Sequence, residues 1–144
     1  VEAGAYIVHL TGKNDPDAEN FNHPNYLALP FYDNMAGLLQ RANLAISRSG
    51  AGTLTELAVT KTPSILIPYP FAAEDHQTYN AKVFEDAGAA QVYAQKQLTP
   101  EILENVVLDL LRSPEKLTVM AEAASSLAII DSAEKLADLV RQAV

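Results

Sequence analysis

Short apolar runs alternate with helix-like spacing along the chain, and this alternation predicts its fold. Mostly apolar runs bounded by polar or proline-containing segments predict buried strands, which we place at 5–10, 26–29, 44–47, 64–67 and 90–93. Apolar residues three or four positions apart predict helices, which we place from 33 to about 42, at 53–59 and 77–87, from 99 to 111, from 113 to about 127, and from 132 onward. Strands that alternate with helices favour βαβ units, so we predict an α/β fold with a parallel sheet flanked by helices.

Capping signals indicate where several of these helices begin and end. Asp33 is the expected N-cap of the first helix, and Thr99 and Ser113 each precede a proline at a first helical position. Gly88 is the expected stop of the helix that precedes it. The polar segment 11–24 is expected to be a loop.

The composition fits a globular chain and excludes several classes of function. Of the 144 residues, 49% are apolar and 19% charged, so we expect a single domain over 1–144 with a buried core. The chain has no cysteine, which excludes a disulfide scaffold, a cysteine nucleophile and a thiolate metal site. The net charge of −8 argues against a nucleic-acid partner, and no apolar run approaches the roughly 18 residues that span a bilayer. Because the first residue is Val1 and not Met, we expect the chain to begin inside a longer protein.

The segment 47–56, with the sequence SRSGAGTLTE, joins a predicted strand to a predicted helix. Glycines at such a turn let backbone N–H groups approach an anion, and the helix dipole favours negative charge there. The segment has neither the G-x-G-x-x-G fingerprint nor the lysine of a P-loop. It is therefore either a plain tight turn or a diphosphate site, and its place beyond the carboxyl end of a strand favours the site.

Glu56 has two interpretations. Thr53 and Glu56 have the spacing of a capping box, in which the glutamate binds the backbone N–H of the cap residue. Alternatively, the Glu56 carboxylate accepts hydrogen bonds from both ribose hydroxyls of a nucleotide. The local sequence leaves both interpretations open.

A second polar segment follows the strand predicted at 64–67, so it is expected at the same edge of the sheet. Asp75 is either a helix N-cap or a polar ligand, and His76 is either a solvated loop residue or part of the site. Gln77 and Asn80 are amides one helical turn apart, so they point the same way. Such amides suit recognition of sugar hydroxyls, and the alternative is plain surface.

Other candidate residues give weaker signals. Phe31 and Tyr32 follow a predicted strand, where they either flank a base or pack the loop. His9 and His23 lack partners at metal-ligand spacing, and no Asp-x-Asp pair suggests a nucleotide-bound metal. The G-x-S-x-G elbow is absent, because Ser49 lacks the leading glycine. No metal ion and no other cofactor are expected.

Several separate motifs, taken in their order, closely resemble the C-terminal half of the MurG family. The resemblance extends from about His9 to the C-terminus, and its motifs lie at 31–35, 47–56, 68–70, 75–81 and 87–90. The family transfers N-acetylglucosamine from UDP-N-acetylglucosamine to lipid I, which forms lipid II of peptidoglycan. Family members have the two-domain GT-B fold, so the resemblance implies a Rossmann-like C-terminal domain that binds the donor.

The resemblance also implies roles for individual residues. The backbone near Phe31 and Tyr32 would hold the uracil, and Glu56 would hold the ribose. The family is inverting and uses no metal ion on the nucleotide. The remaining implied donor contacts are diphosphate binding by Gly50, Ala51, Gly52 and Thr53, support of that turn by Arg48 and Ser49, and reading of the sugar hydroxyls by Gln77 with His76 and Asn80.

Two departures from the family pattern concern what precedes Val1. The family's C-terminal half starts with another strand and a Gly-Gly-Ser-Gln-Gly-Ala loop, and neither is found in the sequence. The N-terminal half, with the family's catalytic base and acceptor surface, is also lacking. We therefore expect a donor-binding fragment that holds no catalytic residue and does not turn over alone. Lipid I would bind the missing half of a cytoplasmic enzyme peripheral to the inner face of the plasma membrane. Self-association is expected, because the missing strand leaves its neighbours unpaired.

Three alternatives remain open from the sequence. The chain is also similar in pattern to donor-binding halves of other GT-B glycosyltransferases, namely glycolipid synthases and the split N-acetylglucosamine transferase of the dolichol pathway. An epimerase that acts on UDP-N-acetylglucosamine has a similar two-domain fold and would need acidic residues at the sugar, for which Glu74 and Asp75 are the candidates. A non-enzymatic nucleotide-binding module is the third alternative.

Overall fold

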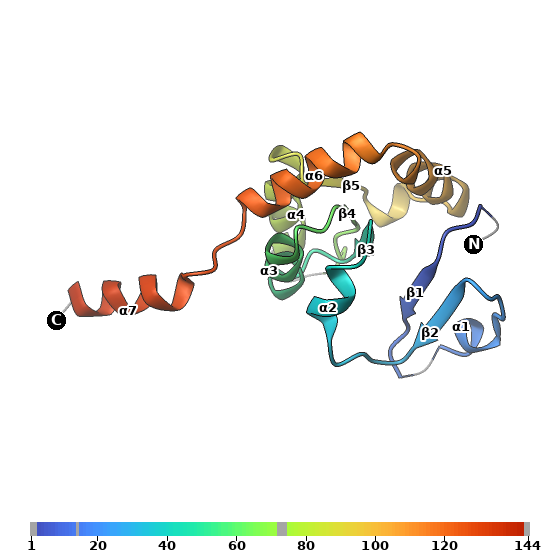
Figure 1. Ribbon diagram of the computed structural model, residues 1–144, viewed down its shortest axis with the longest axis horizontal. Coiled ribbons are helices and arrows are strands. Elements are labelled where there is room, and N and C mark those ends of the chain that lie inside the picture. Colours follow the sequence, from blue (N-terminus) through green and yellow to red (C-terminus); the bar gives the residue numbers. More distant parts are fainter. Residues whose placement is uncertain (1–2, 14, 72–74, 143–144) are drawn as a thin grey trace. The chain divides into compact units, whose positions relative to one another are not determined.

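The computed structural model describes residues 3–13, 15–71 and 75–142. The chain divides into two compact units, Val1–Gly37 and Leu38–Val144, whose elements are shown in Figure 1. The expectation of a single domain over 1–144 stays a prediction. In both units the strands are parallel, as the sequence predicts.

The first unit contains two paired strands and one short helix. Strand β1 (Ile7–Leu10) pairs with β2 (Tyr26–Leu29) in parallel, with Ile7 opposite Tyr26. Helix α1 (Pro16–Asn20) lies between them in sequence, so the prediction of an unbroken loop over 11–24 is wrong. Proline at the first position of α1 is compatible with a helix start, and the Asn20 side chain donates to the Pro16 carbonyl at 2.7 Å.

The two histidines of this unit are held by local contacts. His9 Nδ1 lies 2.7 Å from the Tyr26 hydroxyl, and His23 Nδ1 accepts from the Asn25 N–H at 3.0 Å. The Phe21 ring packs edge-on against Tyr26 with centroids 4.9 Å apart. His9 thus lies near the end of β1 and His23 in the segment before β2. Within the described ranges, no group of three or more His, Asp or Glu side chains is arranged to hold a metal ion.

Helix α2 (Met35–Leu39) spans the boundary between the units. Its cap is Asn34, whose Oδ1 accepts from the Gly37 N–H at 2.9 Å, so the prediction of Asp33 as cap is wrong by one residue. Both residue types are good caps, and the sequence does not distinguish two adjacent ones. The helix ends before 42 because Arg41 and Ala42 donate to carbonyls three residues back, which tightens the chain into a turn.

The second unit contains a three-stranded sheet in the order β3-β4-β5. Figure 1 shows the helices α3, α4, α5 and α6 gathered around these strands. All predicted strands and helices of this unit are confirmed within a few residues, whereas η2 was not predicted. Their bounds are β3 (Ala45–Ser47), α3 (Ala51–Thr60), β4 (Ser64–Leu66), α4 (His76–Asp86), β5 (Ala90–Val92), the 3-10 helix η2 (Gln95–Gln97), α5 (Pro100–Leu111), α6 (Pro114–Ser126) and α7 (Ser132–Gln142).

The core of the second unit covers both faces of the central strand β4. Ile65 and Leu66 point to opposite faces of the sheet, and both have no exposed surface. Ile65 packs with Leu110 of α5 and Met120 of α6. Among the described helices, none has the length and apolar character needed to cross a membrane.

Within the described part of the chain, one buried side-chain polar atom has no hydrogen-bond partner. This atom is the hydroxyl oxygen of Ser64. A buried hydroxyl without a partner lowers the stability of the folded state, because it loses its bonds to water. We expect Ser64→Ala to leave the free energy of unfolding unchanged or to raise it by up to about 1 kcal/mol. Urea unfolding measures this change, and a loss of more than about 1 kcal/mol would show that the hydroxyl is bonded in solution.

Candidate functional site

The glycine turn connects β3 to α3, and it leaves a helix N-terminus open. Gly50 is the N-cap, with φ −65° and ψ 147°, and no side chain caps the helix. The first backbone bond of the helix runs from the Leu54 N–H to the Gly50 carbonyl at 3.0 Å. The N–H groups of Ala51, Gly52 and Thr53 precede it, so they have no acceptor within the helix. The turn therefore presents free donors at the positive end of a helix dipole.

The two glycines of this turn lie beside open space. Neither Gly50 nor Gly52 has a positive φ, so the backbone conformation alone does not require glycine. A Cβ built on either residue would meet no atom within 4 Å. The interpretation as a plain tight turn leaves both glycines unexplained, whereas an anion held close to the backbone explains them.

Glu56 does not belong to a capping box. Helix α3 starts at Ala51 and its N-cap is Gly50, so Thr53 lies inside the first turn and cannot be the cap. This removes one of the two interpretations of Glu56. Its side chain is exposed on the same helix, and its carboxylate has no hydrogen bond or ion pair within the described ranges. The role at a ribose stays a prediction.

Three polar groups of Ser49 bind the start of α4. Ser49 Oγ donates to the Gln77 carbonyl at 2.6 Å, and Gln77 Oε1 accepts from the Ser49 N–H at 3.3 Å. Asn80 Nδ2 donates to the Ser49 carbonyl at 3.1 Å. Gln77 Oε1 also accepts from the Tyr69 N–H at 2.9 Å. The amides of α4 are therefore not plain surface, because Asn80 binds the loop after β3 and Gln77 binds the loops after β3 and β4.

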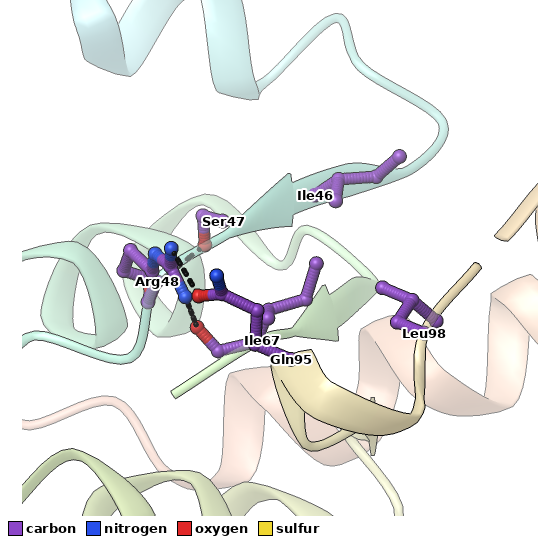
Figure 2. A pocket seen from close by; sticks show the side chains of 6 residues that line it. All are labelled: Ile46, Ser47, Arg48, Ile67, Gln95 and Leu98. Atoms are coloured by element: carbon purple, nitrogen blue, oxygen red, sulfur yellow. Dashed lines mark hydrogen bonds between the residues drawn. The ribbon is translucent and has the colours of Figure 1, made fainter. Parts of the chain in front are cut away.

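Arg48 binds the loop after β4 and the helix η2. Its guanidinium donates to the carbonyls of Ile67 and Pro68 at 3.1 and 3.3 Å, and to Gln95 Oε1 at 2.8 Å. The guanidinium carbon also lies 5.5 Å from the centre of the Tyr69 ring. Figure 2 shows the contacts of Arg48 with Ile67 and Gln95 at the wall of a pocket of about 330 Å³, which Ile46, Ser47, Arg48, Ile67, Gln95 and Leu98 line. The role of Arg48 in supporting the glycine turn stays a prediction.

Asp75 and His76 mark the beginning of α4. Asp75 occupies the N-cap position, as one interpretation predicted, but its φ is +57° and its side chain binds no backbone N–H of the helix. Its carboxylate accepts instead from the Thr78 hydroxyl at 2.6 Å. His76 is the first residue of the helix and is exposed. Glu74, the other acidic residue considered for an epimerase, lies outside the described residues.

Phe31 and Tyr32 belong to the first unit, whereas the glycine turn belongs to the second. Both rings are exposed, by 74% and 40%. They follow β2, whose carboxyl end is the edge where ligands bind in parallel sheets. Their role at a base stays a prediction.

Arg48 should contribute measurably to the stability of the second unit. Arg48→Ala removes three hydrogen bonds and the packing of the side chain on Tyr69. Because Arg48 is largely exposed, we expect a loss of only about 1–2 kcal/mol in the free energy of unfolding. Urea unfolding measures it, with Arg41→Ala as a control at an exposed arginine whose side chain has no described partner. Equal effects of the two substitutions would contradict this role of Arg48.

A family model for the glycosyltransferase family 28 C-terminal domain matches residues 2–141. The chain belongs to this family. The match covers nearly all of the chain and includes the glycine turn, Glu56 and the start of α4. The chain is therefore the α/β C-terminal domain of a GT-B glycosyltransferase, and the resemblance seen in the sequence is confirmed.

Curated relatives and solved structures agree with the family. The chain is 73% identical over 98% of its length to a protein of Gloeothece citriformis named UDP-N-acetylglucosamine–N-acetylmuramyl-(pentapeptide) pyrophosphoryl-undecaprenol N-acetylglucosamine transferase. It is 70% identical over its full length to a protein of the same name from Synechocystis sp.. The chain spans only 39% and 41% of the length of these two relatives.

Two crystal structures are similar in fold. The structure of Acinetobacter baumannii MurG matches 95% of this chain and 43% of its own, with a TM-score of 0.84 and 34% identity. The glycosyltransferase VinC, solved in complex with dTDP, matches with a TM-score of 0.75 over 96% of this chain and 34% of its own. At 24% identity, the likeness to VinC shows the fold alone.

Proposed function

We propose that this chain is the donor-binding part of an inverting glycosyltransferase that transfers N-acetylglucosamine from UDP-N-acetylglucosamine to lipid I. The names of the relatives support both the donor and the acceptor. The chain spans about two fifths of those relatives, so lipid I would bind outside it. In the longer protein we expect a peripheral location at the inner face of the plasma membrane.

The open N-terminus of α3 is the observation that carries the proposal. Three N–H groups at 51–53 precede the first helical bond, and a Cβ built on Gly50 or Gly52 would meet no described atom within 4 Å. A diphosphate bound there would face fixed donors and the positive end of the helix dipole. The same donors would stabilise the charge that grows on the diphosphate as it leaves the sugar, and such stabilisation is often the greatest single contribution to catalysis.

The side chains around the turn suit the rest of a nucleotide sugar. The Glu56 carboxylate is an acceptor without a described partner, as two ribose hydroxyls would require. Gln77 Nε2 and Asn80 Oδ1 are the two amide atoms that no described residue binds, so they offer one donor and one acceptor to sugar hydroxyls. Phe31 and Tyr32 would border the uracil.

The transfer would be a single displacement. The 4-hydroxyl of the N-acetylmuramoyl unit of lipid I would lose its proton to a base outside this chain, attack the anomeric carbon of the donor, form the new glycosidic bond and displace UDP with inversion. This chain would orient the donor and stabilise the leaving diphosphate. We assign no catalytic base to it, and we expect the chain alone to bind the donor without transferring it.

Calorimetric titration of UDP-N-acetylglucosamine into this chain, without added metal, tests the proposal. We expect binding, and weaker binding of dTDP-glucose, because the donor differs at the base and at the sugar. No heat with a folded sample would contradict the proposal for this chain. Tighter binding of dTDP-glucose would point to a different donor.

Self-association of this chain is also expected. In the two described sheets, β1 and β3 each have one strand neighbour, so each leaves one edge without a described strand partner. Apolar side chains at these strands are exposed, including Val8 and Ile46. Exposed edges of this kind pair with strands of other copies. Light scattering over a range of concentrations measures the mass, and a monodisperse monomer throughout would contradict the expectation.

A further inference from the structure

We propose that Gln77 and Asn80 are positioning residues for the diphosphate-binding N–H groups, and that they act through their bonds to the backbone and the hydroxyl of Ser49. The inference rests on the proposed function. It assigns to these two amides an effect on phosphate binding, in addition to any contact with the sugar.

Ser49 is the residue through which the effect passes. It directly precedes Gly50, the N-cap of α3, and it has no exposed surface. Its N–H, its carbonyl and its hydroxyl are each bound by a residue of α4. A fully buried side chain cannot touch a nucleotide, so Ser49 influences a ligand only through the conformation of the turn.

The turn lacks a capping side chain that would hold it in place. Most helix N-termini are fixed by a Ser, Thr, Asp or Asn at the N-cap, but Gly50 has no side chain to do this, and no side-chain cap bond is made. Glycine is also the residue with the greatest backbone freedom. The bonds that join Gln77 and Asn80 to Ser49 therefore hold the turn in place, as a capping side chain would otherwise do. They fix the direction of the N–H groups at 51–53 and leave these groups unbound.

Gln77 also binds the loop after β4. Its Oε1 accepts from both the Ser49 and the Tyr69 N–H groups, at 3.3 and 2.9 Å. One side-chain atom thus joins the exits of two neighbouring strands. Preorganised donors contribute most when they need no rearrangement on binding, so loosening this connection should weaken the phosphate contacts first.

The inference predicts which ligands lose affinity. UDP contains the diphosphate but no sugar beyond its ribose, so a residue that only reads the hydroxyls of N-acetylglucosamine has no effect on UDP. A residue that positions the turn affects UDP and UDP-N-acetylglucosamine to the same extent. The ratio of the two affinities therefore separates the two roles.

Calorimetric titration of UDP and of UDP-N-acetylglucosamine into the unaltered chain, Ser49→Ala and Asn80→Ala tests the inference. We expect both variants to bind UDP about fivefold more weakly, the loss of one net hydrogen bond. In Ser49→Ala the affinity for UDP-N-acetylglucosamine should fall by the same factor, so the ratio of the two affinities should not change. In Asn80→Ala it should fall by at least that factor, because this variant also loses the Oδ1 atom that we assign to the sugar. Thermal unfolding of each variant shows that it is folded, and Ser49→Ala, which removes a single oxygen atom, decides the matter if Asn80→Ala unfolds.

Two matched controls should leave both affinities unchanged. Ser64→Ala makes the same change at another fully buried serine, whose hydroxyl has no partner among the described residues. Asn43→Ala removes an exposed amide without a described partner. A loss for UDP-N-acetylglucosamine alone in Asn80→Ala, or no loss for either ligand in Ser49→Ala, would overturn the inference while the proposed function stands. If the unaltered chain binds neither ligand, the proposed function itself fails, and the inference fails with it.

Discussion

Glu56→Ala is expected to weaken the binding of UDP by about 1–3 kcal/mol, which is about fivefold to 150-fold in the dissociation constant. The Glu56 carboxylate lies exposed on α3, whose N-terminus we assign to the diphosphate. Two ribose hydroxyls that donate to this carboxylate would lose a charged acceptor in the variant. Calorimetric titration of UDP measures the change.

A control variant and a control ligand show whether the loss in Glu56→Ala comes from a contact with the ribose hydroxyls. Glu104→Ala removes an exposed carboxylate of α5 that has no described partner, and it should leave UDP binding unchanged. Uridine diphosphate lacking both ribose hydroxyls should bind the unaltered chain and Glu56→Ala equally. Glu56→Ala that binds UDP as tightly as the unaltered chain would remove Glu56 from the site.

Ile65→Ala is expected to lower the free energy of unfolding by about 2–5 kcal/mol, a larger loss than we expect from Arg48→Ala. Ile65 lies in the central strand of the second unit, has no exposed surface, and packs with Leu110 and Met120. Its truncation removes apolar contacts and leaves a cavity that the flanking helices cannot fill. Urea unfolding followed by circular dichroism measures the change.

Ile130→Ala is the matched control for the core substitution. The Ile130 side chain is 84% exposed, so the same truncation should change the free energy of unfolding by less than about 0.5 kcal/mol. Similar losses in both variants would contradict the assignment of Ile65 to the core.

The alternation of apolar strands and helical patterns was sufficient to predict the second unit. Its strands are short apolar runs bounded by prolines or polar residues, and β4 at 64–66 is buried throughout, so local sequence defines them well. Local sequence was insufficient where two signals competed. Pro16 begins α1 but is also typical of a loop, and Asn34 caps α2 beside the equally suitable Asp33. The single turn η2 has no periodic pattern from which to predict it.

The sequence marks the residues of the candidate site but not the bonds between them. The glycine turn, Glu56 and the amides of α4 are visible in the sequence, because each follows a strand or starts a helix. Their partners are not, since these bonds join distant positions. Gln95 lies 47 residues from Arg48, and the Tyr69 N–H is a backbone group that no motif marks. The sequence also allowed a capping box at Thr53, which the helix start at Ala51 excludes.

The most direct test of the central claim is a titration of the chain with UDP-N-acetylglucosamine followed by ¹H–¹⁵N NMR. If the donor diphosphate binds the N-terminus of α3, the amide signals of Ala51, Gly52 and Thr53 should shift first and furthest, with smaller shifts at Ser49 and Gln77. Saturable shifts confined to other residues, or no shifts in a folded sample, would contradict the claim.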